Sequence, residues 1–178
     1  HVSVTEFMAA AMMQAICRLQ AEKVPRRKRR KPVKVLLPVN LRNLFPSQTV
    51  RNFASYITPE VDTRLGEYDF AEICRIVHFS MGLENDPRRM RAKIATNVAS
   101  ERSPVLRVMP LFIKNIAMKA VFDMVGECKS CLCMSNLGAV RLPEAMTPYV
   151  ARMDFIIGVQ AKAPHNCGVL SWDGTMYV

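Results

Sequence analysis

The chain has 178 residues, 50% of them hydrophobic, and a formal net charge of +10. This length fits one domain, or one lobe of a larger protein, with enough apolar residues to bury a substantial core. No segment is apolar over the roughly 18 residues that a membrane-spanning helix needs, and the first residues lack a signal-peptide pattern. These absences exclude a membrane span and predict a cytoplasmic protein.

Both ends of the chain read as interior segments. The first residue is His1 rather than Met, and residues 175–178 read as a strand. We therefore expect residues 1–178 to form a single lobe cut from a larger protein. An apolar face that the rest of such a protein would cover should favour self-association of the isolated lobe.

The first predicted helix covers residues 4–20. Ser3 and Glu6 have the spacing of a capping box, in which each side chain binds the backbone N–H of the other residue. Apolar residues recur along the helix at helical spacing and predict a single buried face. They are Val4, Phe7, Met8, Ala11, Met12, Ala15, Ile16 and Leu19.

A run of six consecutive cations follows this helix, made up of Arg26, Arg27, Lys28, Arg29, Arg30 and Lys31. Prolines bracket the run, and a core could not neutralise six like charges, so residues 24–32 are predicted to form a basic surface loop. We interpret it as a solvated loop, with contact to the phosphates of coenzyme A, an acidic carrier protein or nucleic acid as the alternative. Nucleic acid fits less well, because no recognition-helix motif and few stacking aromatic residues accompany the cations.

Residues 33–61 predict two strands joined by a polar loop, and the other elements are organised around them. Alternate residues of the first strand are apolar, which predicts one buried face. These residues are Val33, Val35, Leu37 and Val39. Pro38 has no N–H to donate, so pairing should stop near it, or the strand should lie at an edge. Polar residues, among them Asn40, Arg42 and Asn52, then crowd the end of the strand, where α/β folds usually present their chemistry.

Three helices are predicted in the middle of the chain. The first starts at the cap residue Asp69 and ends or bends at Gly82. The second starts at Pro87, since proline at the first position is typical of a helix start, and Pro104 stops it. The third covers residues 105–125, with a kink at Pro110.

The last third of the chain predicts strands over residues 129–135, 150–160, 167–172 and 175–178. The turn dipeptide Asp173-Gly174 joins the last two strands in a hairpin. Helices and strands that come in separate runs predict an α+β fold. We expect a two-layer sandwich of a mixed β-sheet with helices on one face.

The six cysteines fall mostly within predicted strands and helices, which favours reduced, buried thiols. Cys128, Cys131 and Cys133 have the spacing of half a zinc site. No second pair completes it, and two cysteines on one strand face would leave Cys128 elsewhere, so no metal site is predicted. His78 is interpreted as structural, and the sequence identifies no partner for His165.

Five short phrases occur in a fixed order along the chain: LPVNLR at 37–42, LFPS at 44–47, RNF at 51–53, SNLG at 135–138 and LP at 142–143. In this order they resemble the C-terminal lobe of the condensation-domain superfamily, the acyltransferases similar to chloramphenicol acetyltransferase. The alcohol acetyltransferase-like branch is the most similar. The resemblance covers nearly the whole chain and implies a chloramphenicol acetyltransferase-like lobe.

This resemblance also implies a function. Members of the superfamily have two lobes with a tunnel between them, where an acyl group passes from a thioester of coenzyme A or a carrier protein to a hydroxyl or amine. Their general base is the second His of an HHxxxDG motif, which this chain lacks: His1, His78 and His165 are unpaired in sequence. The resemblance implies that an N-terminal lobe carries the motif, and that this chain alone is inactive.

The resemblance implies that this lobe supplies the tunnel wall and acceptor contacts, and that no catalytic residue lies in this chain. The residues it points to are Asn40, Arg42, Asn52, Ser135 and Asn136, whose amide, guanidinium and hydroxyl groups could orient an acceptor or stabilise an oxyanion. Alternatively, the asparagines only cap loops and Arg42 is a structural salt-bridge partner. A different class of function is a non-catalytic binding module, for nucleic acid or a protein partner, that uses the basic run.

Overall fold

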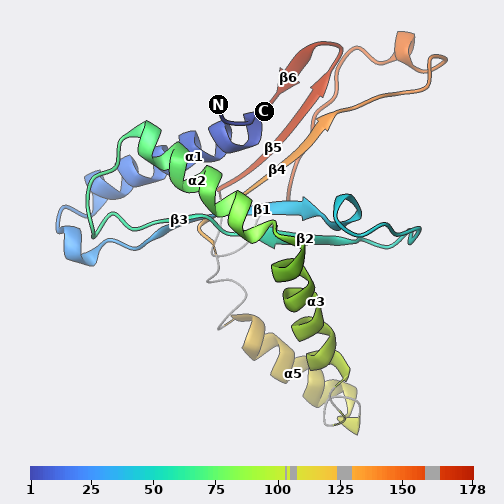
Figure 1. Ribbon diagram of the computed structural model, residues 1–178, viewed down its shortest axis with the longest axis horizontal. Coiled ribbons are helices and arrows are strands. Elements are labelled where there is room, and N and C mark those ends of the chain that lie inside the picture. Colours follow the sequence, from blue (N-terminus) through green and yellow to red (C-terminus); the bar gives the residue numbers. More distant parts are fainter. Residues whose placement is uncertain (103, 105–107, 124–129, 159–164) are drawn as a thin grey trace.

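The computed structural model describes residues 1–178 except 103, 105–107, 124–129 and 159–164 (Figure 1). The described residues form a mixed sheet of six strands in the order β2-β1-β4-β5-β6, with β3 also paired to β1. The strands are β1 (Val33–Asn40), β2 (Ala54–Ile57), β3 (Glu60–Val61), β4 (Leu132–Ala139), β5 (His165–Trp172) and β6 (Thr175–Tyr177). The predicted α+β class and mixed sheet are confirmed.

Four α-helices accompany this sheet in the described part of the chain: α1 (Val4–Lys23), α2 (Phe70–Glu84), α3 (Pro87–Arg102) and α5 (Leu111–Val121). Helices α1 and α2 contact each other and strands β1 to β3, and they share one hydrophobic core with β1. Helices α3 and α5 extend away from the sheet (Figure 1). Met90 anchors α3, because its side chain is fully buried.

Strand β1 lies inside the sheet and carries the predicted alternation. Val33, Val35 and Leu37 are at most 1% exposed and face the core that α1 and α2 complete. Strands β2 and β3 run antiparallel to β1 on one side, and β4 runs parallel to it on the other. Strand β5 continues the parallel arrangement, and β6 returns as a hairpin. The core is therefore built on the face that the sequence pattern predicted.

Pro38 explains why β1 and β4 soon separate. The two strands pair only at Val35 with Leu132 and at Leu36 with Cys133. Along a strand, alternate residues direct their backbone groups to the same neighbour. The carbonyl of Lys34 accepts the N–H of Cys131 on the β4 side, so Pro38 also faces β4 there and has no N–H to donate. Beyond this point the strands diverge (Figure 1). The pairing with β4 thus ends just before Pro38, whereas the pairing with β2 continues through Pro38 to Asn40, and β1 is not an edge strand.

Helix α1 begins where predicted, but its most deeply buried residues are not those of the predicted face. The capping box of Ser3 and Glu6 is formed. The fully buried residues are Ala9, Ala10 and Met13, whereas Val4, Phe7 and Leu19, three of the residues predicted to be buried, are 45–56% exposed. Met8, Met12 and Ile16 pack against the core as predicted, and the prediction was wrong for the exposed residues because α1 packs against both β1 and α2. The small alanine side chains allow this close approach, and they outweigh the stripe of larger apolar residues.

The middle helices begin as predicted, and two internal details differ. Asp69 caps α2, and α3 starts at Pro87. Helix α2 continues through Gly82 to Glu84, because a single glycine costs a helix interior only about 1 kcal/mol. Pro110 is the N-cap of α5 and not a kink within a longer helix. Residues 105–107 and 124–125 of the predicted third helix lie outside the described residues.

Near the C-terminus, one predicted strand is absent. The hairpin forms as predicted on Asp173 and Gly174, which have φ angles of 47° and 74°. Residues 150–158 are not a strand, and 159–160 lie outside the described residues. This segment passes over Gly168 of β5 so closely that a Cβ atom there would lie 2.1 Å from the carbonyl oxygen of Phe155. Apolar and polar residues alternate in this segment as they do in a strand. The segment nevertheless packs across β5 and does not form backbone strand pairing with it.

Candidate functional site

The predicted site residues lie towards the carboxyl ends of two neighbouring parallel strands. Asn40 ends β1, and Ser135 and Asn136 are the two middle residues of β4. Parallel neighbours place their carboxyl ends at the same edge of a sheet, where α/β folds usually bind ligands. Because β1 and β4 diverge after Pro38, the predicted residues form two groups, and no hydrogen bond joins them in the described chain.

The first group belongs to the loop that connects β1 to β2. The side chain of Asn40 accepts a hydrogen bond of 3.1 Å from the backbone N–H of Arg42 and caps the short 3-10 helix Leu41–Asn43. Arg42 donates through Nη2 to the carbonyl oxygens of Thr49, at 2.8 Å, and Arg51, at 2.7 Å. The guanidinium therefore holds the loop closed. Both contacts favour the structural interpretation, although the partners of Arg42 are carbonyls and not a carboxylate.

Asn52 differs from the other two candidates of this loop in that its side chain lacks hydrogen bonds to the described residues. It is exposed, and its side chain makes no hydrogen bond within the described chain. Because Arg42 binds the carbonyl of the preceding residue, the backbone at Asn52 is held close to the end of β1. Its amide is therefore free for an external ligand.

The second group joins β4 to the first turn of α1. Asn136 donates through Nδ2 to the hydroxyl of Thr5 at 3.0 Å and accepts at Oδ1 from the N–H of Gly138 at 2.8 Å. Gly138 has a φ of 73°, which the turn after Asn136 requires and which glycine adopts without strain. Ser135 is half-buried beside Gly168 of β5, and its hydroxyl makes no hydrogen bond within the described residues. Asn136 shapes this edge, and Ser135 offers a free hydroxyl.

The same turn of α1 carries a hydrogen-bonded pair, Glu6 with His78, that the sequence did not reveal. Glu6 is buried, and its Oε1 lies 2.9 Å from Nδ1 of His78 on α2. This contact assigns the proton to Nδ1 and leaves Nε2 free on a half-exposed ring. Sequence reasoning interpreted His78 as structural without naming a partner, because the residues are 72 positions apart. No local spacing could have shown the pair.

The environment of this pair does not supply a nucleophile. Cys74 lies one helical turn before His78 and is buried. Burial raises the pKa of this thiol, and the nearby Glu6 carboxylate raises it further. A neutral buried thiol is a poor nucleophile. The Glu6–His78 pair therefore joins α1 to α2 and holds the turn that contacts Asn136.

Replacing Glu6 by glutamine should lower the free energy of unfolding at pH 7 by about 1–3 kcal/mol, the range for hydrogen bonds to charged groups. Burial by itself would raise the pKa of Glu6, but hydrogen bonds from Ser3 and His78 outweigh it and hold the pKa below its usual value of 4.5. The ionised carboxylate therefore stabilises the fold above that value, and its contribution is lost as the pH falls through the lower folded pKa.

Denaturant unfolding of the wild type and Glu6→Gln, followed from neutral to acidic pH, measures this difference. It should be largest near neutral pH and disappear in acid. Glu22→Gln, an exposed change on the same helix, is the matched control and should have little effect. A difference that stays constant at all pH values would contradict the assignment.

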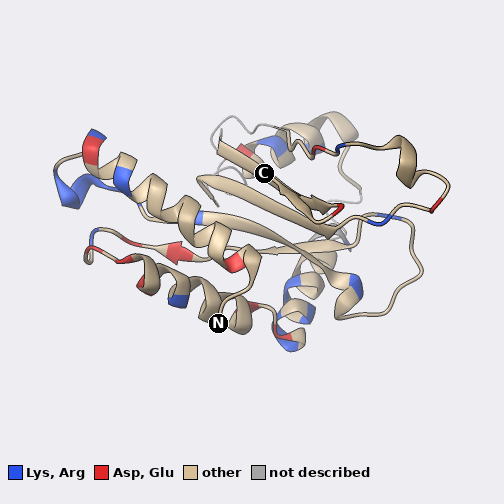
Figure 2. Cartoon of the chain, turned by 90° about the horizontal axis from the view of Figure 1, so that it is seen from above, with Lys and Arg blue, Asp and Glu red and all other residues tan. Residues whose placement is uncertain are grey.

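The basic run forms the predicted loop, and two of its arginines fix its shape. Nε of Arg27 donates to the carbonyl of Thr63, and Nε of Arg30 donates to the carbonyl of Val24, both at 3.0 Å. The remaining cations of the run, Arg26, Lys28, Arg29 and Lys31, are exposed. Figure 2 shows these charges gathered beyond the end of α1. The run is therefore a surface loop held to the fold at two points.

Neither a metal-binding cluster nor a membrane-spanning helix lies in the described part of the chain. The described residues contain no group of three or more His, Cys, Asp or Glu side chains that could hold a metal ion. None of the described helices combines the length and apolar character needed to cross a bilayer. Comparison of the chain with protein-family models, curated proteins and solved structures found no match.

Proposed function

We propose that this chain is the C-terminal lobe of an acyltransferase of the condensation-domain superfamily, with a chloramphenicol acetyltransferase-like fold. The enzyme would move an acyl group from a thioester of coenzyme A or a carrier protein to a hydroxyl or amine. The histidine base would come from the HHxxxDG motif of an N-terminal lobe. This chain would then contribute the wall of the acceptor site.

One observation carries the proposal. The two most distinctive phrases of the resemblance, at 37–42 and 135–138, are separated by most of the helical block in sequence. In the fold, residues 37–42 form the second half of β1 and the start of the 3-10 turn after it, and residues 135–138 lie in the adjacent parallel strand β4, from its middle towards its end. Sites that act on ligands commonly lie at this edge of a sheet. A site assembled from both phrases therefore has a structural basis.

The contacts at this edge suggest different roles for the five candidate residues. Asn40 and Arg42 hold the loop after β1, and Asn136 ties β4 to α1. Ser135 and Asn52 have side chains without hydrogen bonds in the described chain. In the proposed enzyme, the hydroxyl of Ser135 would donate to the acceptor or to the developing oxyanion.

Free thiol released from acetyl-CoA by a two-lobed protein that contains this chain, with a panel of alcohols and amines, tests the proposal. Ser135→Ala should lower kcat/KM about 100-fold, the lower end of the range for losing one oxyanion donor. Ser80→Ala, on the distant helix α2, should leave kcat/KM unchanged. This chain alone should release no thiol.

Two outcomes would count against these assignments. An unchanged kcat/KM in Ser135→Ala would remove this hydroxyl from the site. No transfer from acetyl-CoA or from carrier-bound acyl groups, by folded two-lobed protein, would contradict the acyltransferase proposal itself.

A further inference from the structure

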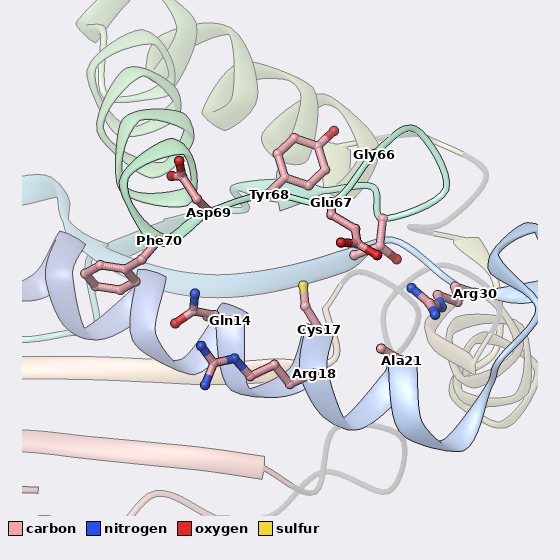
Figure 3. Close-up of a pocket in the computed structure, with 11 residues that line it drawn as sticks. Gln14, Cys17, Arg18, Ala21, Arg30, Gly66, Glu67, Tyr68, Asp69 and Phe70 are labelled. Carbon is pink, nitrogen blue, oxygen red and sulfur yellow. The ribbon is translucent and has the colours of Figure 1, made fainter.

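A groove of about 490 Å³ lies between the second half of α1 and the segment 63–70, at the opposite end of α1 from Thr5 and Asn136. Its walls include Cys17, Arg18 and Ala21 of α1, with Arg30, Glu67 and Tyr68 across from them. Figure 3 shows the Cys17 side chain directed from α1 towards the 66–69 segment, and Arg30 entering from the C-terminal end of the helix. The strand-edge site uses none of these residues.

Thr63 lines the groove with an unused hydroxyl. The residue is 6% exposed, and Oγ1 has no hydrogen-bond partner in the described chain. A buried hydroxyl without a partner is unfavourable, because folding removes its bond to water. Rotation about χ1 to another staggered rotamer can move the hydroxyl of threonine to the position that the methyl group occupied. Thr63 can therefore present its hydroxyl to a ligand in the groove that it lines.

Two guanidinium groups flank the same turn. Arg30 is half-buried and held by its Nε, while its two terminal nitrogens have no partner among the described residues. Arg27 is held against the carbonyl of Thr63, and its Nη2 would lie 3.7 Å from a Cβ atom added at Gly66. Fixed guanidinium groups bind phosphate through charge-assisted hydrogen bonds with little loss of side-chain freedom.

The rest of the groove fits an organic group attached to such an anion. Ala21, Tyr68 and Phe70 supply apolar and aromatic surface. Of the two acidic residues in the wall, Asp69 already accepts the N–H of Glu72 at 2.7 Å, and Glu67 is exposed at the rim. With Arg18, Arg30 and the neighbouring Arg27, the groove carries a local excess of positive charge.

We propose that this groove binds a small organic phosphate, with the phosphate between Arg30 and Thr63 and the organic part along Cys17, Ala21 and Tyr68. The proposal is independent of acyl transfer, because the groove shares no residue with the strand-edge site. In this proposal, Arg30 of the basic run binds the phosphate directly, and Arg27 has a supporting role. The Thr63 hydroxyl gains the partner that it lacks in the unliganded fold.

Three probes test the proposal on the purified chain: phenyl phosphate, benzoate and phenol. Calorimetry measures binding, and alkylation of Cys17 by iodoacetamide, followed by peptide mass spectrometry, reports on occupancy of the groove. Phenyl phosphate should bind and slow alkylation of Cys17, while Cys167 on β5 should react at an unchanged rate. Phenol should not bind. Benzoate should bind at least about tenfold more weakly, because its single carboxylate makes fewer charge-assisted hydrogen bonds.

Variants locate the anion within the groove. Arg30→Gln should weaken phenyl phosphate binding roughly 10- to 100-fold, the loss expected for a charged hydrogen bond. Arg29→Gln removes the same charge from an exposed neighbour outside the groove and should change binding less than about threefold, because solvent screens it. Thr63→Val should weaken binding while raising the Tm of the ligand-free chain, since it removes the unpartnered hydroxyl.

Several results would overturn the proposal. They are no binding of phenyl phosphate, equal binding of benzoate, equal losses in Arg29→Gln and Arg30→Gln, or unchanged binding in Thr63→Val. Thiol release from acetyl-CoA does not enter any of these measurements. Failure here would therefore leave the acyltransferase proposal standing, and the reverse also holds.

Discussion

Replacing Gly168 by alanine should lower the free energy of unfolding by about 3 kcal/mol or more, at or above the upper end for overpacked interiors. The added Cβ atom would lie 2.1 Å from the carbonyl oxygen of Phe155 and 2.9 Å from its ring. Backbone atoms contribute the closest contact, so a change of side-chain rotamer cannot relieve it. Either β5 or the segment 150–158 must move.

This displacement should also reach the candidate site. Gly168 pairs with Ser135 across β4 and β5, so a shift of β5 moves the hydroxyl that the proposed enzyme would use. We expect Gly168→Ala to lose acyl transfer in a two-lobed protein, even at temperatures where the variant remains folded.

Gly82→Ala is the matched control for this substitution. Gly82 lies within α2, and a Cβ atom there meets no other atom within 4 Å. Alanine is the better helix former, so Gly82→Ala should raise the free energy of unfolding by roughly 0.5–1 kcal/mol. Urea unfolding of both variants measures the contrast. Equal stability of Gly168→Ala and the wild type would mean that residues 150–158 do not pass over β5.

Leu132→Ala should cost about 2–5 kcal/mol, the range for a large side chain removed from a packed core. Leu132 is fully buried on β4, where its backbone pairs with Val35 of β1 and His165 of β5. Because the backbone of Leu132 is paired with strands on both sides, the neighbouring atoms cannot easily move to fill the cavity that the substitution leaves. The loss should therefore be large.

Leu137→Ala provides the same chemical change on the same strand. Leu137 is 56% exposed, so its truncation should cost less than about 1 kcal/mol. Thermal unfolding of the two variants under identical conditions gives the comparison. If both variants lose the same stability, Leu132 is not more deeply buried than Leu137, which would contradict the structure.

Local sequence signals predicted the elements well where the interactions are local. The capping boxes of Ser3 with Glu6 and of Asp69 with Glu72 fix two helix starts through bonds within one turn. The turn at Asp173 is equally local, since its backbone conformation is set within two residues. These features need no knowledge of distant parts of the chain.

Patterns that depend on what packs against an element were less reliable. The apolar stripe of α1 pointed to Phe7 and Leu19, yet the helix buries Ala9 and Ala10, because two partners approach it at once. The alternation in residues 150–158 resembled a strand, but the close contact with Gly168 places this segment across β5. The choice of buried face depends on neighbours that periodicity does not identify.

The sequence by itself determined the α+β class, the buried face of β1, the basic loop and the polar residues at the ends of two strands. These follow from periodicity, turn chemistry and the high cost of burying charge. Only the tertiary structure decided that Arg42 holds carbonyls, that Glu6 meets His78, and that Arg30 and Thr63 line one groove. Such contacts join residues whose separation in sequence carries no periodic signal, so packing alone brings them together.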